Sequence, residues 1–363
     1  MSDATRGFAT RAIQAVTPPE CATPPIYMGV TNFGEYTRDS NPTLSVFENA
    51  MMELEGGAGA ISTACGMAAI AQTLMSFLTS GSKLVIHRCV YTSVMQWIEG
   101  EVPKLGIDCV WVDMRDLDAL KDALKDGADV VYTELLANPN MDIIDIEAVA
   151  SLAHEAGAKL VVDNTFTSPY LHRPLEWGAD VVVHSATKYL SGCGDVLGGV
   201  ITTADAELAE RIRFVLTLYG GVISPIHAYL LMRGVKTLAL RMEAATRNAT
   251  AIADLLDGHP KVEFVRYPGL TSTRGHEIAS RLMLRPGGLL AFRPVGGLDT
   301  AYRFAKALTV VRNEVSLGDA QSLAGVCPGW EPAGIEAGLI RVSAGLENVE
   351  DLLADVEQAL GAV

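Results

Sequence analysis

Seven short apolar runs, separated by helix-like stretches, occupy residues 58–203 and constrain the fold of this chain more than any other feature. The runs cover residues 60–62, 83–87, 109–112, 129–133, 159–163, 180–184 and 198–202. Strands that alternate with helices along a chain are typical of a mostly parallel sheet covered by helices. We therefore predict an α/β fold built on a mostly parallel, seven-stranded sheet.

The 363 residues exceed one ordinary hydrophobic core, and 49% of them are apolar. We therefore expect a large domain and a smaller one. Residues 1–45 should form an N-terminal arm that contacts a neighbouring subunit, and Pro18 and Pro19 predict that its first part is extended rather than packed. Residues 46–225 should form the large domain, and residues 226–363 a linker helix with a small α/β domain.

The pattern of the C-terminal part changes after Pro225. It predicts one long linker helix over residues 226–256, with its leucines facing inward. These leucines are Leu230, Leu231, Leu238 and Leu240. Predicted strands cover residues 262–266, 288–292 and 339–342, and predicted helices cover residues 300–308 and 349–360.

The charge pattern excludes several classes of partner. The formal net charge is −15, and no stretch concentrates Lys or Arg, which argues against nucleic acid. No apolar run approaches the roughly 18 to 20 residues that cross a bilayer, and the first ten residues lack a targeting pattern. The six cysteines are spread singly, without the spacings of metal or redox sites. We expect a cytoplasmic protein with no membrane partner and no metal.

Two neighbouring apolar runs end in polar residues that carry chemistry. One is Lys159-Leu-Val-Val-Asp163-Asn, and the other is Asp180-Val-Val-Val-His184-Ser185-Ala-Thr187-Lys188. Ligands of open α/β sheets bind at the carboxyl ends of strands, so these ends should meet in one crevice. Pyridoxal 5′-phosphate (PLP) needs an amine for its aldehyde, hydroxyls for its phosphate and a carboxylate for its ring nitrogen.

Lys188, Ser185, Thr187 and Asp163 offer these groups, and we predict that Lys188 holds PLP as a Schiff base. Each residue also has an ordinary structural interpretation. A lysine after a strand is usually solvated, Asp163 is a common turn former, and Ser185 or Thr187 could cap the next helix. Their combination favours the cofactor site.

With these residues the chain resembles the Cys/Met metabolism family of PLP-dependent enzymes, which includes cystathionine γ-synthases, cystathionine γ-lyases and methionine γ-lyases. Nearly the whole chain takes part in the resemblance, which implies the fold of PLP-dependent transferases, aspartate aminotransferase-like, fold type I. Further motifs carry it, in the family's order: Tyr36-Thr-Arg38 with Asn41-Pro42-Thr43, Cys65-Gly66-Met67-Ala68-Ala69, Glu134-Leu-Leu-Ala-Asn138-Pro139, Val315-Ser316-Leu317-Gly318 and Arg341-Val-Ser343-Ala-Gly345-Leu-Glu347.

The resemblance also implies roles for residues that bind the cofactor. Backbone amides of Gly66 and Met67 should bind the phosphate at a helix start, where amides lack internal partners. Tyr36 and Arg38 should reach the phosphate of a neighbouring subunit. The family's assembly is a tetramer of two site-sharing dimers, so a homotetramer is expected.

Other implied roles concern the substrate. Tyr91 should stack on the PLP ring and assist proton transfer, and Arg341 should bind the substrate carboxylate in a bidentate manner. Asn138 and Ser316 should support the cofactor oxygen and that carboxylate. With Lys188 and Asp163, Tyr91 completes the predicted catalytic set.

The reaction implied by the resemblance is cleavage at the γ (or β) carbon of a sulfur-containing amino acid. We favour a carbon–sulfur lyase of the methionine γ-lyase or cystathionine γ-lyase type, because the loop from Val315 to Ala320 is similar to the methionine γ-lyase version. The alternative is a γ-replacement synthase, either cystathionine γ-synthase-like or one that uses a sulfonium amino acid such as S-adenosylmethionine. A remote alternative is a catalytically silent binding or scaffold relative.

Three departures from the family pattern bear on the substrate. The segment between Tyr27 and Tyr36 is short, residues 328–332 replace a longer loop with a Thr-His pair, and Ser93 stands where methionine γ-lyases have cysteine. We expect a changed pocket wall and entrance.

Overall fold

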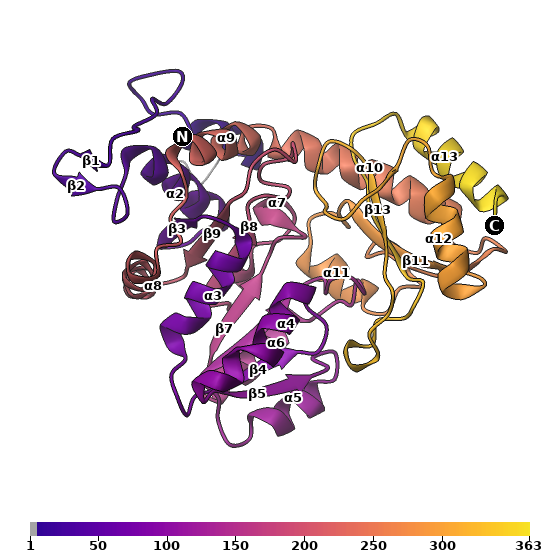
Figure 1. The fold of residues 1–363 in the computed structure, drawn as a ribbon, viewed down its shortest axis with the longest axis horizontal. Helices are drawn as coiled ribbons and strands as arrows, with labels where there is room; N and C mark the ends of the chain where they lie inside the picture. Colours follow the sequence, from indigo (N-terminus) through magenta and orange to yellow (C-terminus); the bar gives the residue numbers. More distant parts are fainter. Residues whose placement is uncertain (1–5) are drawn as a thin grey trace.

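The structure, a computed structural model, describes residues 6–363 of the chain. Its large sheet lies in the N-terminal part, and a second sheet lies in the C-terminal part (Figure 1). The large sheet has seven strands in the order β3-β9-β8-β7-β6-β4-β5. They are β3 (Gly59–Thr63), β4 (Lys83–His87), β5 (Asp108–Val112), β6 (Val130–Glu134), β7 (Lys159–Asp163), β8 (Val181–Ser185) and β9 (Gly199–Thr203).

Pairing in the large sheet confirms the predicted topology. β9 is antiparallel to β3 and β8, and the other pairs are parallel. Each predicted apolar run coincides with one of these strands. The runs are apolar throughout because both faces of the sheet are covered. Val131 packs in one core cluster, whereas its neighbours Val130 and Tyr132 pack in the other.

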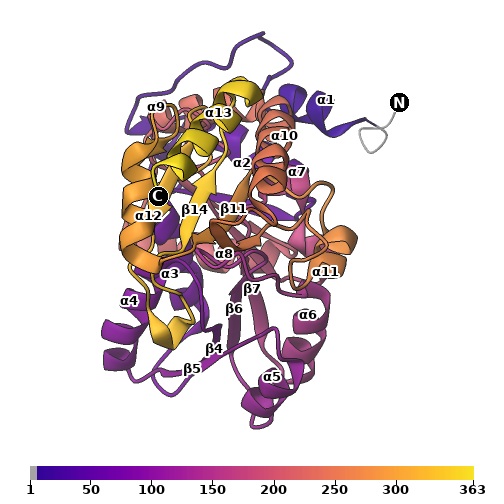
Figure 2. The same cartoon turned by 90° about the vertical axis from the view of Figure 1, so that its right-hand side faces the viewer.

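Helices cover both faces of the large sheet. α3 and α4 lie on one side of the strands, and α5 and α6 lie on the other (Figure 2). The helices of this part are α2 (Pro42–Glu55), α3 (Gly66–Phe77), α4 (Thr92–Gly100), α5 (Leu117–Leu124), α6 (Ile146–Glu155), α7 (Ser168–Leu171) and α8 (Ala206–Tyr219). This arrangement leaves the carboxyl ends of the parallel strands open for a site.

The N-terminal segment differs from its prediction. Residues 1–5 of the predicted arm lie outside the described residues. The next residues form a helix, α1 (Phe8–Ala15), which packs on α2 through the buried Ala12. The prediction of an extended arm is therefore wrong for the residues of α1, because Pro18 and Pro19 follow this helix rather than interrupt it. A two-stranded hairpin, β1 (Thr31–Asn32) and β2 (Glu35–Tyr36), comes next.

The predicted linker helix is two helices, α9 (Pro225–Val235) and α10 (Leu238–Leu256). The break follows Gly234, where a Cβ would lie 2.2 Å from the carbonyl oxygen of Leu190. Leu231 and Leu238 are buried as predicted and Leu230 is partly buried, but Leu240 is 74% exposed. The prediction was thus wrong for one long helix and for Leu240.

The second sheet has the order β10-β11-β14-β13-β12. Its strands are β10 (Val262–Arg266), β11 (Leu289–Pro294), β12 (Arg312–Asn313), β13 (Leu323–Val326) and β14 (Ile340–Ser343), and the helices beside it are α11 (His276–Leu282), α12 (Gly297–Ala307) and α13 (Val349–Gly361). β12, β13 and α11 were not predicted. In residues 6–363, no helix combines the length and the apolar character that a membrane span requires.

Candidate active site

A cavity of about 440 Å³ lies where the carboxyl ends of β6, β7 and β8 face the C-terminal part of the chain. Its lining contains every predicted site residue except Tyr36 and Arg38. These residues are Gly66, Met67, Tyr91, Asn138, Asp163, Ser185, Thr187, Lys188, Ser316 and Arg341. The crevice predicted from the two strand ends is therefore present.

Lys188 lies in the turn that follows β8, and its amine points across the cavity to the C-terminal part. Its Nζ donates a hydrogen bond to Ser316 Oγ at 2.6 Å. Burial lowers the pKa of Lys188, and the positive charge of Arg341 lowers it further. Both effects favour the neutral amine, which is the nucleophilic form.

Asp163 ends β7 and is held by neighbouring groups. Its Oδ1 accepts a hydrogen bond from the Thr165 amide at 2.9 Å, and its Oδ2 accepts one from the Tyr132 hydroxyl at 3.4 Å. Burial raises the pKa of Asp163, while the bonds from Thr165 oppose the rise. A cation beside this carboxylate would favour its charged form, so Asp163 fits the protonated ring nitrogen of PLP.

The start of α3 forms a cradle for an anion. Cys65 precedes it without a side-chain cap among the described residues, and the first amides of a helix lack internal partners. A Cβ on Gly66 would lie 2.6 Å from Ser185 Cβ and 2.9 Å from Ser185 Cα. Only glycine allows this close approach, which brings the helix start against the Ser185 hydroxyl. These groups fit the PLP phosphate.

Thr187 has a second set of contacts. Its hydroxyl donates to the Gly198 carbonyl at 3.2 Å and accepts from the Gly198 amide at 3.1 Å. These bonds join the Lys188 turn to β9. Thr187 lines the cavity while holding the turn in place.

Arg341 extends from β14 into the cavity. Its Nη1 donates to Asn138 Oδ1 at 2.8 Å, and its Nη2 donates to the Ser316 carbonyl at 2.7 Å. Its Nε is buried and has no hydrogen-bond partner among the described residues. A buried guanidinium with an unused donor is costly, so Arg341 suits the binding of an anionic group. Burial lowers the pKa of Arg341.

Glu134 is a site residue for which its motif, Glu134 to Pro139, predicted no role. It ends β6 beside Asp163 in the sheet register. Its two oxygens accept the backbone amides of Tyr91, at 2.7 Å, and of Asn138, at 2.8 Å. Burial raises its pKa well above the ordinary value, and the nearby Asp163 raises it further. The signal was available, because Glu134 is a polar residue at a strand end, as Asp163 is.

Tyr36 and Arg38 lie outside the cavity. Tyr36 is in the β1–β2 hairpin and is 47% exposed, and the Arg38 guanidinium lies 5.4 Å from the centre of its ring. Neither residue lines the site of its own chain. This position is compatible with binding of the phosphate in the site of a neighbouring subunit, which stays a prediction.

The fold and the cavity together define the class of protein. A buried lysine after a strand, a carboxylate at the neighbouring strand end and an anion cradle at a helix start fit a PLP-dependent enzyme of fold type I. The lysine could hold the aldehyde, the carboxylate the ring nitrogen and the cradle the phosphate.

Comparisons with known proteins place the chain within this class. The model of the family described as Cys/Met metabolism PLP-dependent enzyme matches residues 28–361. L-methionine gamma-lyase of Pseudomonas putida is 42% identical over 98% of each chain. Cystathionine gamma-lyase of Bacillus subtilis is 40% identical over 90% of this chain and 88% of the relative.

A solved structure agrees with these relatives. Cystathionine gamma synthase from Xanthomonas oryzae pv. oryzae, in complex with aminoacrylate and cysteine, superposes with a TM-score of 0.95 at 36% identity and covers 98% of both chains. The chain belongs to the Cys/Met metabolism family of PLP-dependent enzymes, so it is an enzyme that uses PLP and an amino-acid substrate.

Proposed function

We propose that this enzyme is a carbon–sulfur lyase that cleaves the γ (or β) carbon–sulfur bond of a sulfur-containing amino acid. Relatives named L-methionine gamma-lyase and cystathionine gamma-lyase, at about 40% identity, support this activity. The observation that carries the proposal is that Lys188 and Arg341 meet at Ser316, the first at its hydroxyl and the second at its carbonyl, in the cavity that Asp163 also lines. This places the Lys188 amine within reach of a substrate whose carboxylate is held by Arg341.

In this proposal the cofactor is bound by groups from several elements. Lys188 holds the PLP aldehyde, and Asp163 holds the ring nitrogen. Gly66 and Met67 amides bind the phosphate with the hydroxyls of Ser185 and Thr187. Arg38 and Tyr36 of a neighbouring subunit add to this set. When bound, PLP acts as an electron sink for the charge that develops at the substrate α carbon.

The side chains around the cofactor move protons in the proposed reaction. Lys188 removes the α proton, because burial and the charge of Arg341 lower its pKa and so favour the free amine that acts as a base. It can then move a proton from the β carbon. Tyr91, whose backbone is fixed by Glu134, donates a proton to the leaving thiol. Arg341, with Asn138 and Ser316, keeps the substrate carboxylate in one orientation.

The second candidate is γ-replacement, in which a nucleophile attacks after the γ-substituent has left. The structural similarity to cystathionine gamma synthase favours it. Differences in chain length from the lyases are also compatible with γ-replacement. The alignment with the P. putida relative spans 389 positions, more than the 363 residues of this chain. The relative therefore has segments that this chain lacks.

An absorbance scan of the purified protein followed by substrate addition tests the proposal. The substrates are L-methionine, L-cystathionine, L-homocysteine and S-adenosylmethionine, with detection of 2-oxo acid and thiol. Release of 2-oxobutyrate from one of them supports the lyase. Spectral shifts without oxo acid would support γ-replacement instead. A protein that never binds added PLP would contradict both and favour the silent relative.

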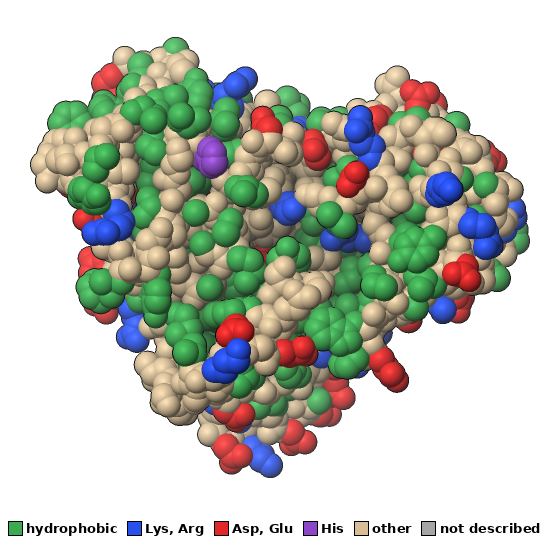
Figure 3. Space-filling view, in the orientation of Figure 1, with side chains coloured by type: hydrophobic (Ala, Val, Ile, Leu, Met, Phe, Trp, Pro, Cys, Tyr) green, Lys and Arg blue, Asp and Glu red, His purple; other side chains and the backbone are tan. Residues whose placement is uncertain are grey.

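We also propose a cytoplasmic homotetramer made of two site-sharing dimers, in which residues 1–45 contact a neighbouring subunit. Apolar side chains are exposed on the hairpin and α8: Phe33 at 84%, Phe214 at 64% and Leu218 at 67%. Figure 3 shows apolar side chains at the surface on the side that holds these elements in Figure 1. All six cysteines are unpaired, which supports a reducing compartment.

Mixing inactive variants tests site sharing. If Arg38 serves the neighbour, subunits with Arg38→Ala and subunits with Lys188→Ala should regain activity when mixed and reassembled. Failure to regain it, with hybrids verified by mass, would contradict the shared site. Light scattering gives the oligomeric state.

A further inference from the structure

The loop between β13 and β14, residues 328–338, leaves the second sheet and packs on the large one; we name it the strap. Its base is closed by hydrogen bonds between Cys327 and Leu339 and between Gly338 and Cys327. Its tip is closed by Trp330 and Ile335, which pair with each other. Ala333 and Ile335 are 2% and 8% exposed, and they belong to the core cluster that also contains residues of α3 and α4.

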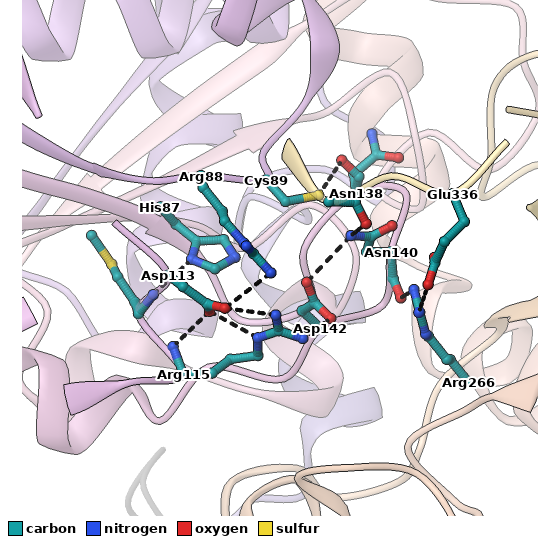
Figure 4. Close-up of polar contacts among 12 residues, drawn as sticks. His87, Arg88, Cys89, Asp113, Arg115, Asn138, Asn140, Asp142, Arg266 and Glu336 are labelled. Carbon is teal, nitrogen blue, oxygen red and sulfur yellow. Dashed lines mark hydrogen bonds and ion pairs between the residues drawn. The ribbon is translucent and has the colours of Figure 1, made fainter. Parts of the chain in front are cut away.

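The strap also makes polar contacts with the large-sheet part (Figure 4). Asn140 Nδ2 donates to the Gly334 carbonyl at 2.9 Å. Arg266, in β10, donates to Glu336 at 2.7 Å and to the Asn140 carbonyl at 3.4 Å. A Cβ on Gly334 would lie 3.1 Å from Arg88 Nη2, so the strap backbone lies directly on that guanidinium. Asn140 is therefore held from two sides by the C-terminal part.

Asn140 belongs to a tight turn, residues 137–142, which follows β6. The Met141 amide donates to the Ala137 carbonyl at 2.7 Å, and the Ala137 amide donates to the Asp142 carbonyl at 2.9 Å. The Asp142 side chain accepts a hydrogen bond from Asn140 at 3.4 Å and pairs with Arg115, which binds Asp113 through two nitrogens. One end of the turn is thus anchored on charged groups of the large-sheet part.

The other end of the turn enters the active-site cavity. Asn138 lies two residues before Asn140, and its Oδ1 accepts the bond from Arg341. The Asn138 amide is held by Glu134, and its carbonyl accepts a weak bond from Cys89 Sγ at 3.6 Å. The same short turn therefore contacts the strap at one end and Arg341 at the other.

We propose that Asn140 is a positioning residue for recognition of the substrate carboxylate: by docking the strap on the 137–142 turn, it fixes Asn138 and so orients Arg341. The inference rests on the proposed role of Arg341. A purely packing role explains Asn140 poorly. The residue is 2% exposed, and its Oδ1 has no hydrogen-bond partner among the described residues, so the side chain carries a buried unpaired acceptor in order to make the Nδ2 bond to the Gly334 carbonyl.

Calorimetric titration of the PLP-loaded enzyme with two probes tests the proposal. L-norleucine carries no γ leaving group, and n-pentylamine is the same molecule without its carboxylate. The ratio of their dissociation constants measures how well the enzyme recognises the carboxylate. In Asn140→Ala this ratio should fall by about tenfold or more, the loss expected when a misplaced Arg341 makes one charged hydrogen bond fewer to the carboxylate, while pentylamine affinity is kept. An unchanged ratio would overturn the proposal, as would equal weakening of both probes.

Two further variants complete the design. Arg281→Ala removes another contact between the same two parts of the chain, the pairing of α11 with Asp145 and Glu147, and should leave the ratio unchanged. A similar loss in this control would overturn the specific role of Asn140. Arg341→Ala separates the proposed role of Arg341 from that of Asn140. If the ratio of dissociation constants in Arg341→Ala equals that of the wild type, the proposed role of Arg341 is wrong. If the ratio falls in Arg341→Ala but not in Asn140→Ala, only the proposed role of Asn140 is wrong.

If Asn140→Ala does not fold, the same ratio of dissociation constants is measured in Asn140→Ser. Serine keeps a polar group but is too short to reach the Gly334 carbonyl. Its ratio should fall as in the alanine variant, and a wild-type ratio would overturn the proposal.

Discussion

Replacement of Gly66 by alanine perturbs the phosphate cradle with a single methyl group. In the structure this methyl group would lie 2.6 Å from Ser185 Cβ, 2.8 Å from Ser185 Oγ and 2.9 Å from Ser185 Cα. The third atom belongs to the backbone of β8, so a side-chain rotation cannot relieve the clash. Either the start of α3 or the end of β8 must move.

The size of the effect follows from two costs. Overpacking of a well-packed site costs about 1–3 kcal/mol, which should lower the free energy of unfolding of the apoprotein. Movement of the helix start also weakens a hydrogen bond from an amide to the phosphate, and bonds to charged groups contribute about 1.5–3 kcal/mol. Because 1.4 kcal/mol is a factor of ten, the dissociation constant for PLP should rise between about tenfold and a hundredfold.

The assay is titration of the apoprotein with PLP, followed by absorbance, together with thermal unfolding with and without the cofactor. The stabilisation by PLP should shrink in Gly66→Ala, because ligand-linked stability depends on affinity. Gly361→Ala is the matched control, since a Cβ there meets nothing within 4 Å and lies in α13. Unchanged PLP affinity in Gly66→Ala would refute the cradle at α3.

Four further predictions concern the site and the core. Lys188→Ala should abolish turnover and the covalent PLP adduct, which mass spectrometry detects after borohydride reduction; an adduct on another residue would contradict the assignment. Arg341→Lys should raise KM for the amino acid by about tenfold to a hundredfold with PLP binding intact, because lysine cannot form the bidentate contact. Tyr91→Phe should lower kcat more than it raises KM in steady-state kinetics, because the lost hydroxyl acts as an acid; an unchanged kcat would remove that role. Burial lowers the pKa of His87 to about 3 from 6.5. Below pH 6.5, therefore, His87 is mostly protonated in the unfolded chain but stays neutral in the folded one. The free energy of unfolding should therefore fall by about 2 kcal/mol from this group between pH 7 and pH 5, and denaturant titrations of His87→Gln should show a flatter pH dependence.

The ends of the central strands were predictable because burial forces apolar residues along each strand and leaves the polar ones at the ends. Asp163 and the Lys188 turn follow from that rule, and Glu134 obeys it equally. Pro18 and Pro19 predict an extended segment, but their effect does not reach back to helix α1, where Phe8 and Ala12 have helical spacing. The break between α9 and α10 was not predictable, since it depends on the approach of Gly234 to the Lys188 turn.

The distances between the predicted groups could not come from the sequence. Lys188 and Ser316 are 128 positions apart, yet their side chains meet at 2.6 Å, and Arg341 meets Asn138 across 203 positions. Each pair joins the large-sheet part to the C-terminal part, so the site is complete only when the two parts are correctly placed. The strap, which the sequence marked only as a changed loop, makes that placement specific through Gly334 and Asn140. Variation in such a loop can therefore change substrate recognition while every motif residue stays the same.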